Sequence, residues 1–333
     1  MTGTQDLFYR SVQRQSGTTF GSLVRAESAM VFTKVIYIDT ERGADGNAGT
    51  TIGKACKTIN GAVDKCYGGD NDTAKGRHFA LVLQGRTTTG LAQTAMQTLD
   101  VEGLHLIGAG QWFGHGGGGD SCLVCGSSSG YASKTAIKVT RSNCSIEGIK
   151  FYMPSEYGLG SEESYIYSTN PTDFAVANCQ FIGANANGDC TGLYSNGILI
   201  EGAEGFVLVN NQFLYCYNGL KAGAGSSRYF HKAIIDNNHM FGCAKGIYFY
   251  DTYALENDIG RNIILRPSPS GVAYGYTMTG GIDFGGNPSG NYVHDNRVGH
   301  ATKTTAYVKG SGTNYWSLNY YDAGSGGTLY DGG

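Results

Sequence analysis

The chain has 333 residues, of which 53 are glycine and 23 are tyrosine; only 15% are charged, and the formal net charge is −3. This charge predicts no nucleic-acid partner, because neutralising phosphates requires a basic surface. No apolar run approaches the roughly 20 residues that a membrane-spanning helix needs, so we expect a soluble chain without membrane insertion.

Residues 1–34 contain turn residues and no internal repeat. The segment lacks the apolar core and the small-residue cleavage site of a secretory signal, which predicts a protein made in a cytosol. The nine cysteines are an odd number without framework spacing, so we expect mostly buried, reduced thiols. Residues 1–34 could bury little surface alone, and we expect them to form an arm that packs on a partner subunit or a larger particle.

Residues 35–66 read VIYIDTERGADGNAGTTIGKACKTINGAVDKC. The order predicts a strand, a Gly/Asp-rich loop and a short helix near 55–66. Ile59, Ala62 and Val63 fall on one face of that helix. Such a helix would cover the open end of a stack of strands, which otherwise leaves unpaired backbone groups.

A repeated stretch occupies the middle of the chain. Residues 210–220 read NNQFLYCYNGL and residues 237–247 read NNHMFGCAKGI, so asparagine, cysteine and glycine recur together. A repeat of roughly 20–50 residues marks an array of stacked units. Four further segments, each alternating apolar and polar residues, align with these two. The aligned positions hold Ile149, Cys179, Asn211, Asn238, Asn262 and Asn296.

A second strand signal follows in each unit. It reads NGILIEG (196–202), NGLKAGA (218–224), KGIYFYD (245–251) and GGIDFGG (280–286). These strands are too short and too rich in β-branched and aromatic residues for paired helices, and they predict a parallel β-helix with a coil rise of about 4.8 Å. We expect Asn211, Asn238, Asn262 and Asn296 to form a structural ladder at a bend, where asparagine tolerates left-handed backbone. We also expect Cys216 to lie over Cys243.

The start of the chain resembles pectate-lyase-like proteins, in which a strand, a Gly/Asp-rich loop and an A-x-K-T-I-x-x-A-V helix cap the first coil. The matching residues are Tyr37, Asp39, Gly46, Gly49, Ala55, Lys57, Thr58, Ile59, Ala62 and Val63. HFALVLQG (78–85) and VEGLHLIGAG (101–110) are similar to the first coil of that superfamily. The resemblance implies an all-β, single-stranded right-handed parallel β-helix over 35–300, with a Gly/Tyr-rich tail over 301–333. The resemblance does not indicate an activity, because the superfamily includes lyases, hydrolases and inert spikes.

Outward side chains of the second strand supply the candidate site. Alternation turns Leu199, Lys221, Tyr248 and Asp283 outward, with Glu201, Tyr250 and Asp251 just beyond. Sugar-cleaving enzymes need two carboxylates about 5–9 Å apart, so the catalytic candidates are Asp251, Asp283 and Glu201. The candidates for glycan contact are Lys221, Tyr248 and Tyr250, because exposed tyrosines suit sugar stacking and interfaces. The alternative is a solvated sheet without chemistry.

The sequence carries weaker signals for a lyase, a metal site and a phosphate-binding loop. A lyase would use Lys221, Arg228 or His231 as its base, but no acidic triplet with calcium-ligand spacing accompanies them. The single CxxC, CLVC at 122–125, lacks a second pair, and glycine-rich 112–120 lacks the Lys-Ser/Thr of a phosphate loop. The sequence therefore predicts no metal and no cofactor.

Three functions fit these features. The first, implied by the family resemblance, is a structural virion protein of a bacteriophage: a homotrimeric spike, fibre or capsid decoration protein. It would be exposed on the particle, joined to other virion proteins through residues 1–34 and adhering to a host surface polysaccharide. The second is a tailspike depolymerase, a glycoside hydrolase or polysaccharide lyase. The third is a secreted pectin- or alginate-degrading enzyme, disfavoured by the missing signal. We expect the first, and the sequence leaves enzymatic activity open.

Overall fold

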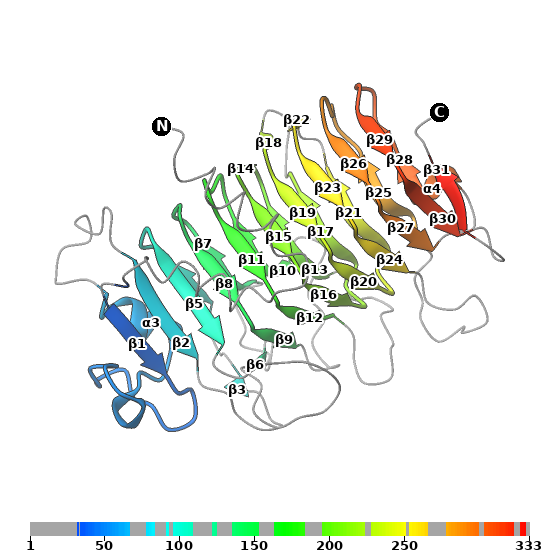
Figure 1. Ribbon diagram of the computed structural model, residues 1–333. Helices are drawn as coiled ribbons and strands as arrows, with labels where there is room; N and C mark the ends of the chain where they lie inside the picture. Colours follow the sequence, from blue (N-terminus) through cyan, green and yellow to red (C-terminus); the bar gives the residue numbers. More distant parts are fainter. Residues whose placement is uncertain are drawn as a thin grey trace.

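The chain is a parallel β-helix, seen here in a computed structural model (Figure 1). The structure describes residues 32, 34–66, 78–83, 91–92, 96–108, 122–124, 135–152, 163–183, 195–223, 228–250, 253–265, 278–299, 303–322 and 327–330. In these residues, successive coils add strands in parallel to three long sheets and one short sheet.

Each sheet collects one strand from successive coils. Sheet A contains β1 (Lys34–Ile38), β2 (Phe79–Leu83), β5 (Leu104–Gly108), β8 (Ser145–Glu147), β11 (Ala175–Ala177), β15 (Val207–Val209), β19 (Ile234–Asp236), β23 (Asp258–Gly260), β26 (Tyr292–His294) and β29 (Tyr315–Ser317). Sheet B contains β3 (Leu91–Ala92), β6 (Cys122–Val124), β9 (Lys150–Tyr152), β12 (Gln180–Ile182), β16 (Gln212–Leu214), β20 (His239–Phe241), β24 (Ile263–Leu265), β27 (Arg297–Gly299), β30 (Asn319–Asp322) and β31 (Gly327–Tyr330).

Sheets C and D complete each coil. Sheet C contains β4 (Gln97–Leu99), β7 (Thr135–Val139), β10 (Glu163–Ser168), β13 (Ser195–Ile200), β17 (Asn218–Ala222), β21 (Lys245–Phe249), β25 (Gly280–Phe284) and β28 (Tyr307–Val308). Sheet D contains β14 (Ala203–Glu204), β18 (Tyr229–His231) and β22 (Tyr253–Leu255). The described helices are η1 (Ile52–Lys54), α3 (Ile59–Val63) and α4 (Lys303–Ala306).

Inward residues of the three long sheets fill the bore of the helix. Because neighbouring coils are in register, identical residue types stack into columns. Phe151, Phe181 and Phe213 form such a column, with ring centroids 4.9 and 4.7 Å apart. Cys216 and Cys243 are both buried at matching positions of successive coils.

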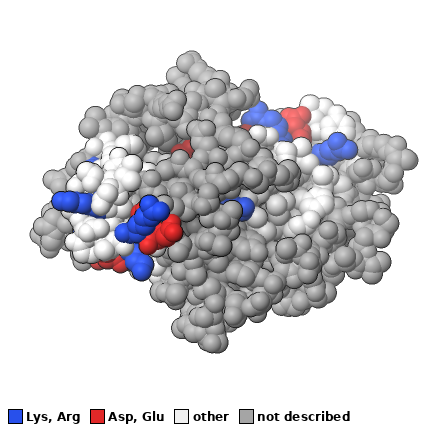
Figure 2. All heavy atoms as spheres, turned by 90° about the horizontal axis from the view of Figure 1, so that it is seen from below, with Lys and Arg blue, Asp and Glu red and all other residues white. Residues whose placement is uncertain are grey.

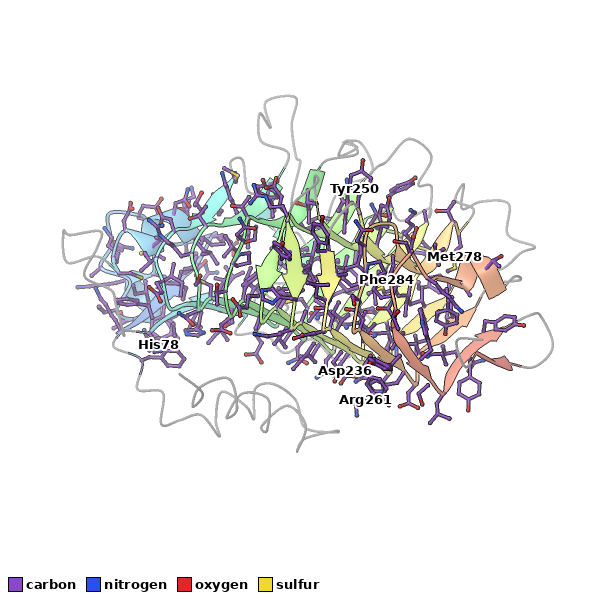
Figure 3. The ribbon with its side chains drawn as sticks, turned by 90° about the horizontal axis from the view of Figure 1, so that it is seen from above. His78, Asp236, Tyr250, Arg261, Met278 and Phe284 are labelled. Carbon is purple, nitrogen blue, oxygen red and sulfur yellow. The ribbon has the colours of Figure 1, made fainter. Side chains whose placement is uncertain are left out.

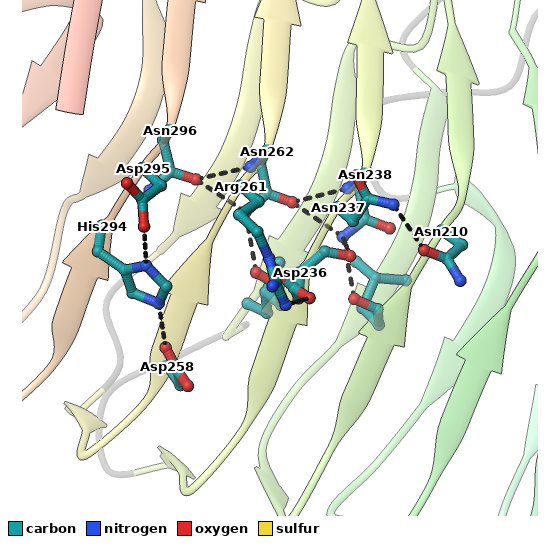
Figure 4. A network of polar contacts seen from close by, with 12 residues as sticks. Asn210, Asp236, Asn237, Asn238, Asp258, Arg261, Asn262, His294, Asp295 and Asn296 are labelled. Atoms are coloured by element: carbon teal, nitrogen blue, oxygen red, sulfur yellow. Dashed lines mark hydrogen bonds and ion pairs between the residues drawn. The ribbon is translucent and has the colours of Figure 1, made fainter. Parts of the chain in front are cut away.

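An asparagine ladder closes the bend between sheets A and B. In each rung the backbone N–H and side-chain Nδ2 donate to the Oδ1 of the next asparagine, at 2.9 to 3.1 Å (Figure 4). The donating rungs are Asn211, Asn238, Asn262 and Asn296, and the ladder ends at Asn319, which accepts from Asn296. The residue before each rung has a left-handed backbone, as Asn237 does with φ of 53°. The bend therefore keeps its buried peptide groups paired.

A second asparagine ladder, which the sequence analysis missed, closes the bend before sheet A. Asn257 donates its Nδ2 to the Oδ1 of Asn291 at 2.7 Å, and Asn291 donates to Asn314 at the same distance. Lys232 and Glu256, at the matching bends, again have positive φ. The same kind of asparagine ladder therefore stabilises two of the bends of the β-helix.

The N-terminal end of the stack is covered by α3, which is shorter than the expected helix near 55–66. The Thr58 side chain caps it by accepting from the Gly61 N–H. Asn60 then ties the helix to β4: its Oδ1 accepts from the Thr98 N–H at 2.7 Å, and its N–H donates to Gln97 Oε1 at 3.0 Å. These bonds occupy part of an edge that would otherwise be open.

The β-helix extends past residue 300, where the sequence analysis placed its end. Strands β28, β29 and β30 add one more coil to sheets C, A and B, and β31 pairs antiparallel with β30. The reason is that Asn314 and Asn319 continue both ladders. The expected arm, 1–34, lies outside the described residues except for Phe32 and Lys34. No described helix is long and apolar enough to span a membrane.

Candidate functional site

The candidate site lies on the outer face of sheet C. Leu199, Lys221, Tyr248 and Asp283 pair in register on β13, β17, β21 and β25 and so form one column. Leu199 is 3%, Lys221 8% and Asp283 6% exposed, although they point away from the core. Tyr250, two residues beyond Tyr248, is 43% exposed. Figure 3 shows Tyr250 on the opposite side of the molecule from Asp236 and Arg261.

In β17 and β21, a glycine lies two residues before the outward residue of this column. At Gly219, an added Cβ would lie 2.9 Å from Met240 Sδ, and at Gly246 it would lie 2.7 Å from Ile264 Cδ1. Both partners are inward residues of sheet B, so the glycine backbone lies directly on the core. The next residue, such as Ile247, enters the core, and the one after it turns outward.

Lysine and tyrosine side chains contact each other across this face. Lys245 Nζ lies 3.3 Å from the centroid of the Tyr248 ring and 2.6 Å from Asp283 Oδ2. Lys221 Nζ lies 5.0 Å from the Tyr250 ring centroid, and the two tyrosine rings are 5.6 Å apart. Cation–π contacts of this kind hold the rings in place as platforms for a ligand.

Glu201 is held by two partners. Its Oε1 accepts a hydrogen bond from the Tyr167 hydroxyl at 2.6 Å, and its Oε2 lies 3.4 Å from Arg228 Nη2. Burial, then Glu201 itself, raises the pKa of Tyr167 to about 12, so the phenol stays a donor. Glu201 is therefore fixed as an acceptor in the structure.

The structure does not bring the candidate carboxylates together. Glu201 directly follows β13, whereas Asp283 lies on β25, with β17 and β21 between them. Three coil steps correspond to about 14 Å, beyond the about 5–9 Å that glycoside hydrolysis requires. Asp251, the third candidate, lies outside the described residues.

A buried polar row beside the column was missed by the sequence analysis. Ser164, Asn196, Asn218 and Lys245 are paired in register. Asn218 Nδ2 donates to Asn196 Oδ1 at 2.6 Å. Ser164 Oγ and Asn218 Oδ1 are buried without a hydrogen-bond partner. An unpaired polar atom in a buried position is energetically costly. In the sequence, the repeated Asn-Gly pair could have indicated this polar row.

The bases of the lyase alternative are engaged elsewhere. Arg228 contacts Glu201, and His231 Nε2 lies 3.8 Å from Glu204 Oε2. Lys221 is the residue stacked on Tyr250. In the part of the chain that the structure describes, no group of three or more His, Cys, Asp or Glu side chains is placed to hold a metal ion.

A polar network on the outer face of sheet A is distinct from this site (Figure 4). His294 lies 2.9 Å from both Asp258 and Asp295, through its two ring nitrogens. The hydrogen bond to Asp258, then that to Asp295, raises the pKa of His294. Arg261 pairs with Asp236. These pairs join coils on the surface. On the face in Figure 2, described positive and negative side chains likewise lie beside one another in small groups.

Comparisons with known proteins reveal the fold. No protein-family model matches the chain, and no curated protein matches its sequence. Among solved structures, the pectate lyase Pel9A is similar with a TM-score of 0.52 at 13% identity, over 90% of this chain and 80% of that one. A pectin methylesterase in complex with a hexasaccharide has a TM-score of 0.45 at 11% identity, over 90% and 92% of the two chains. The Dettilon tailspike protein has a TM-score of 0.36 at 15% identity, over 87% and 68%.

Only the first of these likenesses exceeds a TM-score of 0.5, and at 13% identity it shows the fold alone. The fold is a pectate-lyase-like parallel β-helix.

Proposed function

We propose that this chain is a structural virion protein of a bacteriophage, a trimeric β-helix spike, fibre or capsid decoration protein. It binds a host surface polysaccharide on the outer face of sheet C and does not cut it. The carrying observation is that tyrosine platforms there are held by lysines, while Asp283 and Glu201 each have a cationic partner.

Binding is favoured over cleavage by the placement of the carboxylates. A glycosidase needs two carboxyl groups that flank the same bond. Asp283 on β25 pairs with Lys245, whereas Glu201, which follows β13 three coil steps away, pairs with Arg228. Tyr248 and Tyr250 offer ring faces on which a sugar can stack.

The remaining surface suits packing against copies of the chain. Tyrosine is enriched at protein interfaces. Among the described residues, the exposed tyrosines away from Tyr250 are Tyr229, Tyr253, Tyr292, Tyr315 and Tyr320. They lie on sheets D, A and B, whereas Tyr250, which directly follows β21 of sheet C, is 43% exposed.

Replacing Tyr250 with alanine is expected to weaken polysaccharide binding about fivefold, because a ring platform contributes about 1 kcal/mol. Binding to a panel of purified capsular polysaccharides and lipopolysaccharides, measured by biolayer interferometry, checks this. Tyr229→Ala removes an exposed ring from sheet D and should leave binding unchanged. Release of reducing ends or unsaturated products by the parent chain, lost in Asp283→Asn, would instead establish a depolymerase.

The virion role predicts a stable trimer that accompanies phage particles. Light scattering should give a mass of about three times the 35.3 kDa of one chain. Mass spectrometry of gradient-purified particles from the producing culture should detect the protein. A monomer in solution would contradict the trimer, and absence from purified particles would contradict the virion assignment.

A further inference from the structure

The C-terminal part of sheet A exposes ordered tyrosines on its outer face. We define the C-terminal A face as the outer face of β19, β23, β26 and β29, together with the bends on either side (Figure 1). Tyr292 and Tyr315 pair in register on β26 and β29 and are 46% and 63% exposed. The Tyr292 ring stacks on that of His294, with centroids 4.6 Å apart. Tyrosine is enriched at protein interfaces, and a ring that is already ordered loses little entropy on binding.

Opposite charges border this face in a single coil. Glu256 lies at the bend before β23 and Arg261 at the bend after it, both with left-handed backbone, at φ of 55° and 54°. Glu256 is exposed, and Arg261 pairs with Asp236 while 48% of its side chain stays exposed. Five residues of nearly extended chain, about 17 Å, separate the two bends. Glu256 and Arg261 therefore cannot contact each other within one chain.

We propose that the C-terminal A face packs around the three-fold axis of a trimer, with Glu256 of one copy beside Arg261 of the next; this inference rests on the trimer of the proposed function. A rotation about an axis parallel to the β-helix keeps every residue at its own height along that axis. The border before β23 in one copy therefore meets the border after β23 in its neighbour. Tyr292 and Tyr315 then pack against their counterparts near the axis.

The neighbouring coils bring no like charges together in this arrangement. In the coil before, Lys232 and Asn237 occupy the two borders, and in the coil after, Gly290 and Asp295 occupy them. A cation thus meets an amide, and a carboxylate meets a glycine. Like charges across an interface oppose association, so the order of charges along both borders favours a second copy of this chain as the occupant.

The carboxylate in the tyrosine column has a cationic partner in its own chain. Asp258 pairs in register with Tyr292, and its Oδ1 lies 2.9 Å from His294 Nε2. The hydrogen bond to Asp258 raises the pKa of His294, which favours the imidazolium form. Three copies of Asp258 near the axis would otherwise repel one another. The His294 pair therefore makes the centre of the face compatible with a three-fold contact.

Cysteine cross-linking of the full chain tests this arrangement. The double variant Glu256→Cys/Arg261→Cys is treated with a bis-maleimide whose span is shorter than the distance across sheet A. Covalent dimers and trimers are expected on a denaturing gel, because the two sites meet only between copies. The parent chain, which accounts for the native cysteines, and Glu256→Cys alone are the controls. Neither should give these products, since a three-fold contact does not bring two copies of residue 256 together.

Charge reversal provides a second measurement. Glu256→Arg places two cations at the contact and should raise the dissociation constant of the trimer at least tenfold, measured by analytical ultracentrifugation on dilution. Adding Arg261→Glu should restore most of the affinity. Lys54→Glu reverses an exposed charge in η1, near the other end of the β-helix, and should keep the parent value.

The outcomes separate this inference from the proposed function. A trimeric parent chain whose double cysteine variant stays unlinked, or whose affinity is unchanged by Glu256→Arg, would overturn the C-terminal A face as the contact and leave the trimer intact. A monomeric parent chain would contradict both. If Tyr315→Ala stayed trimeric but lost polysaccharide binding, the face would be a ligand site and the inference would also fail.

Discussion

The free energy of unfolding is expected to fall by about 4 kcal/mol when Asn238 is replaced with leucine, a change of similar size without polar atoms. Asn238 is fully buried, and its Oδ1 accepts from both the N–H and the Nδ2 of Asn211 at 3.0 Å. Its Nδ2 donates to the carbonyls of Leu208 and Asp236 and to Asn262. Leucine would leave these groups buried and unpaired, each at a cost of about 1–3 kcal/mol. Urea unfolding followed by circular dichroism measures the loss.

The adjacent position provides the control. Asn237 is exposed, and its side chain donates to the similarly placed Asn210, at 2.8 Å. Glycine tolerates its left-handed backbone, so Asn237→Gly should cost less than about 1 kcal/mol. If Asn238→Leu were no more damaging than Asn237→Gly, the ladder would not be a stabilising element, and the bend would be held by its backbone alone.

The fold could be predicted because its stabilising elements recur in the sequence. Asn211 and Asn238 repeat together with a following glycine, and the structure stacks these positions coil by coil. The second ladder carries an equally regular signal that was overlooked. Asn257 and Asn262, Asn291 and Asn296, and Asn314 and Asn319 are all five residues apart. That spacing would also have moved the end of the β-helix beyond residue 300.

The site was predicted less well, because its chemistry depends on contacts between coils. Alternation placed Lys221, Tyr248 and Asp283 outward, but it could not show that Lys245 reaches Asp283 from the neighbouring strand. Nor does alternation reveal that two coils separate Glu201 from Asp283 unless each strand is assigned to its coil.

Gly246→Ala is expected to destabilise the chain by about 3 kcal/mol, because an added methyl group has no space. Its Cβ would lie 2.7 Å from the carbonyl oxygen of Gly281 in the next coil and 2.7 Å from Ile264 Cδ1 in the core. Neither neighbour can move independently: one is backbone within a sheet, and the other is fully buried. A shifted midpoint with an unchanged m value in urea unfolding would identify a packing effect rather than a change in the unfolded state.

Gly53→Ala is the matched control, because a Cβ at Gly53 would meet nothing within 4 Å. It should change the free energy of unfolding by no more than about 0.5 kcal/mol. The two substitutions add the same methyl group, so their difference isolates the close approach of sheets B and C. Gly246 also directly follows Lys245 and precedes Tyr248 by two residues, so strain there should displace the Lys245–Tyr248 contact and weaken polysaccharide binding. Equal stability of the two variants would mean that the glycine column is not required for the coil to close, and that the outward column is set by the flanking residues instead.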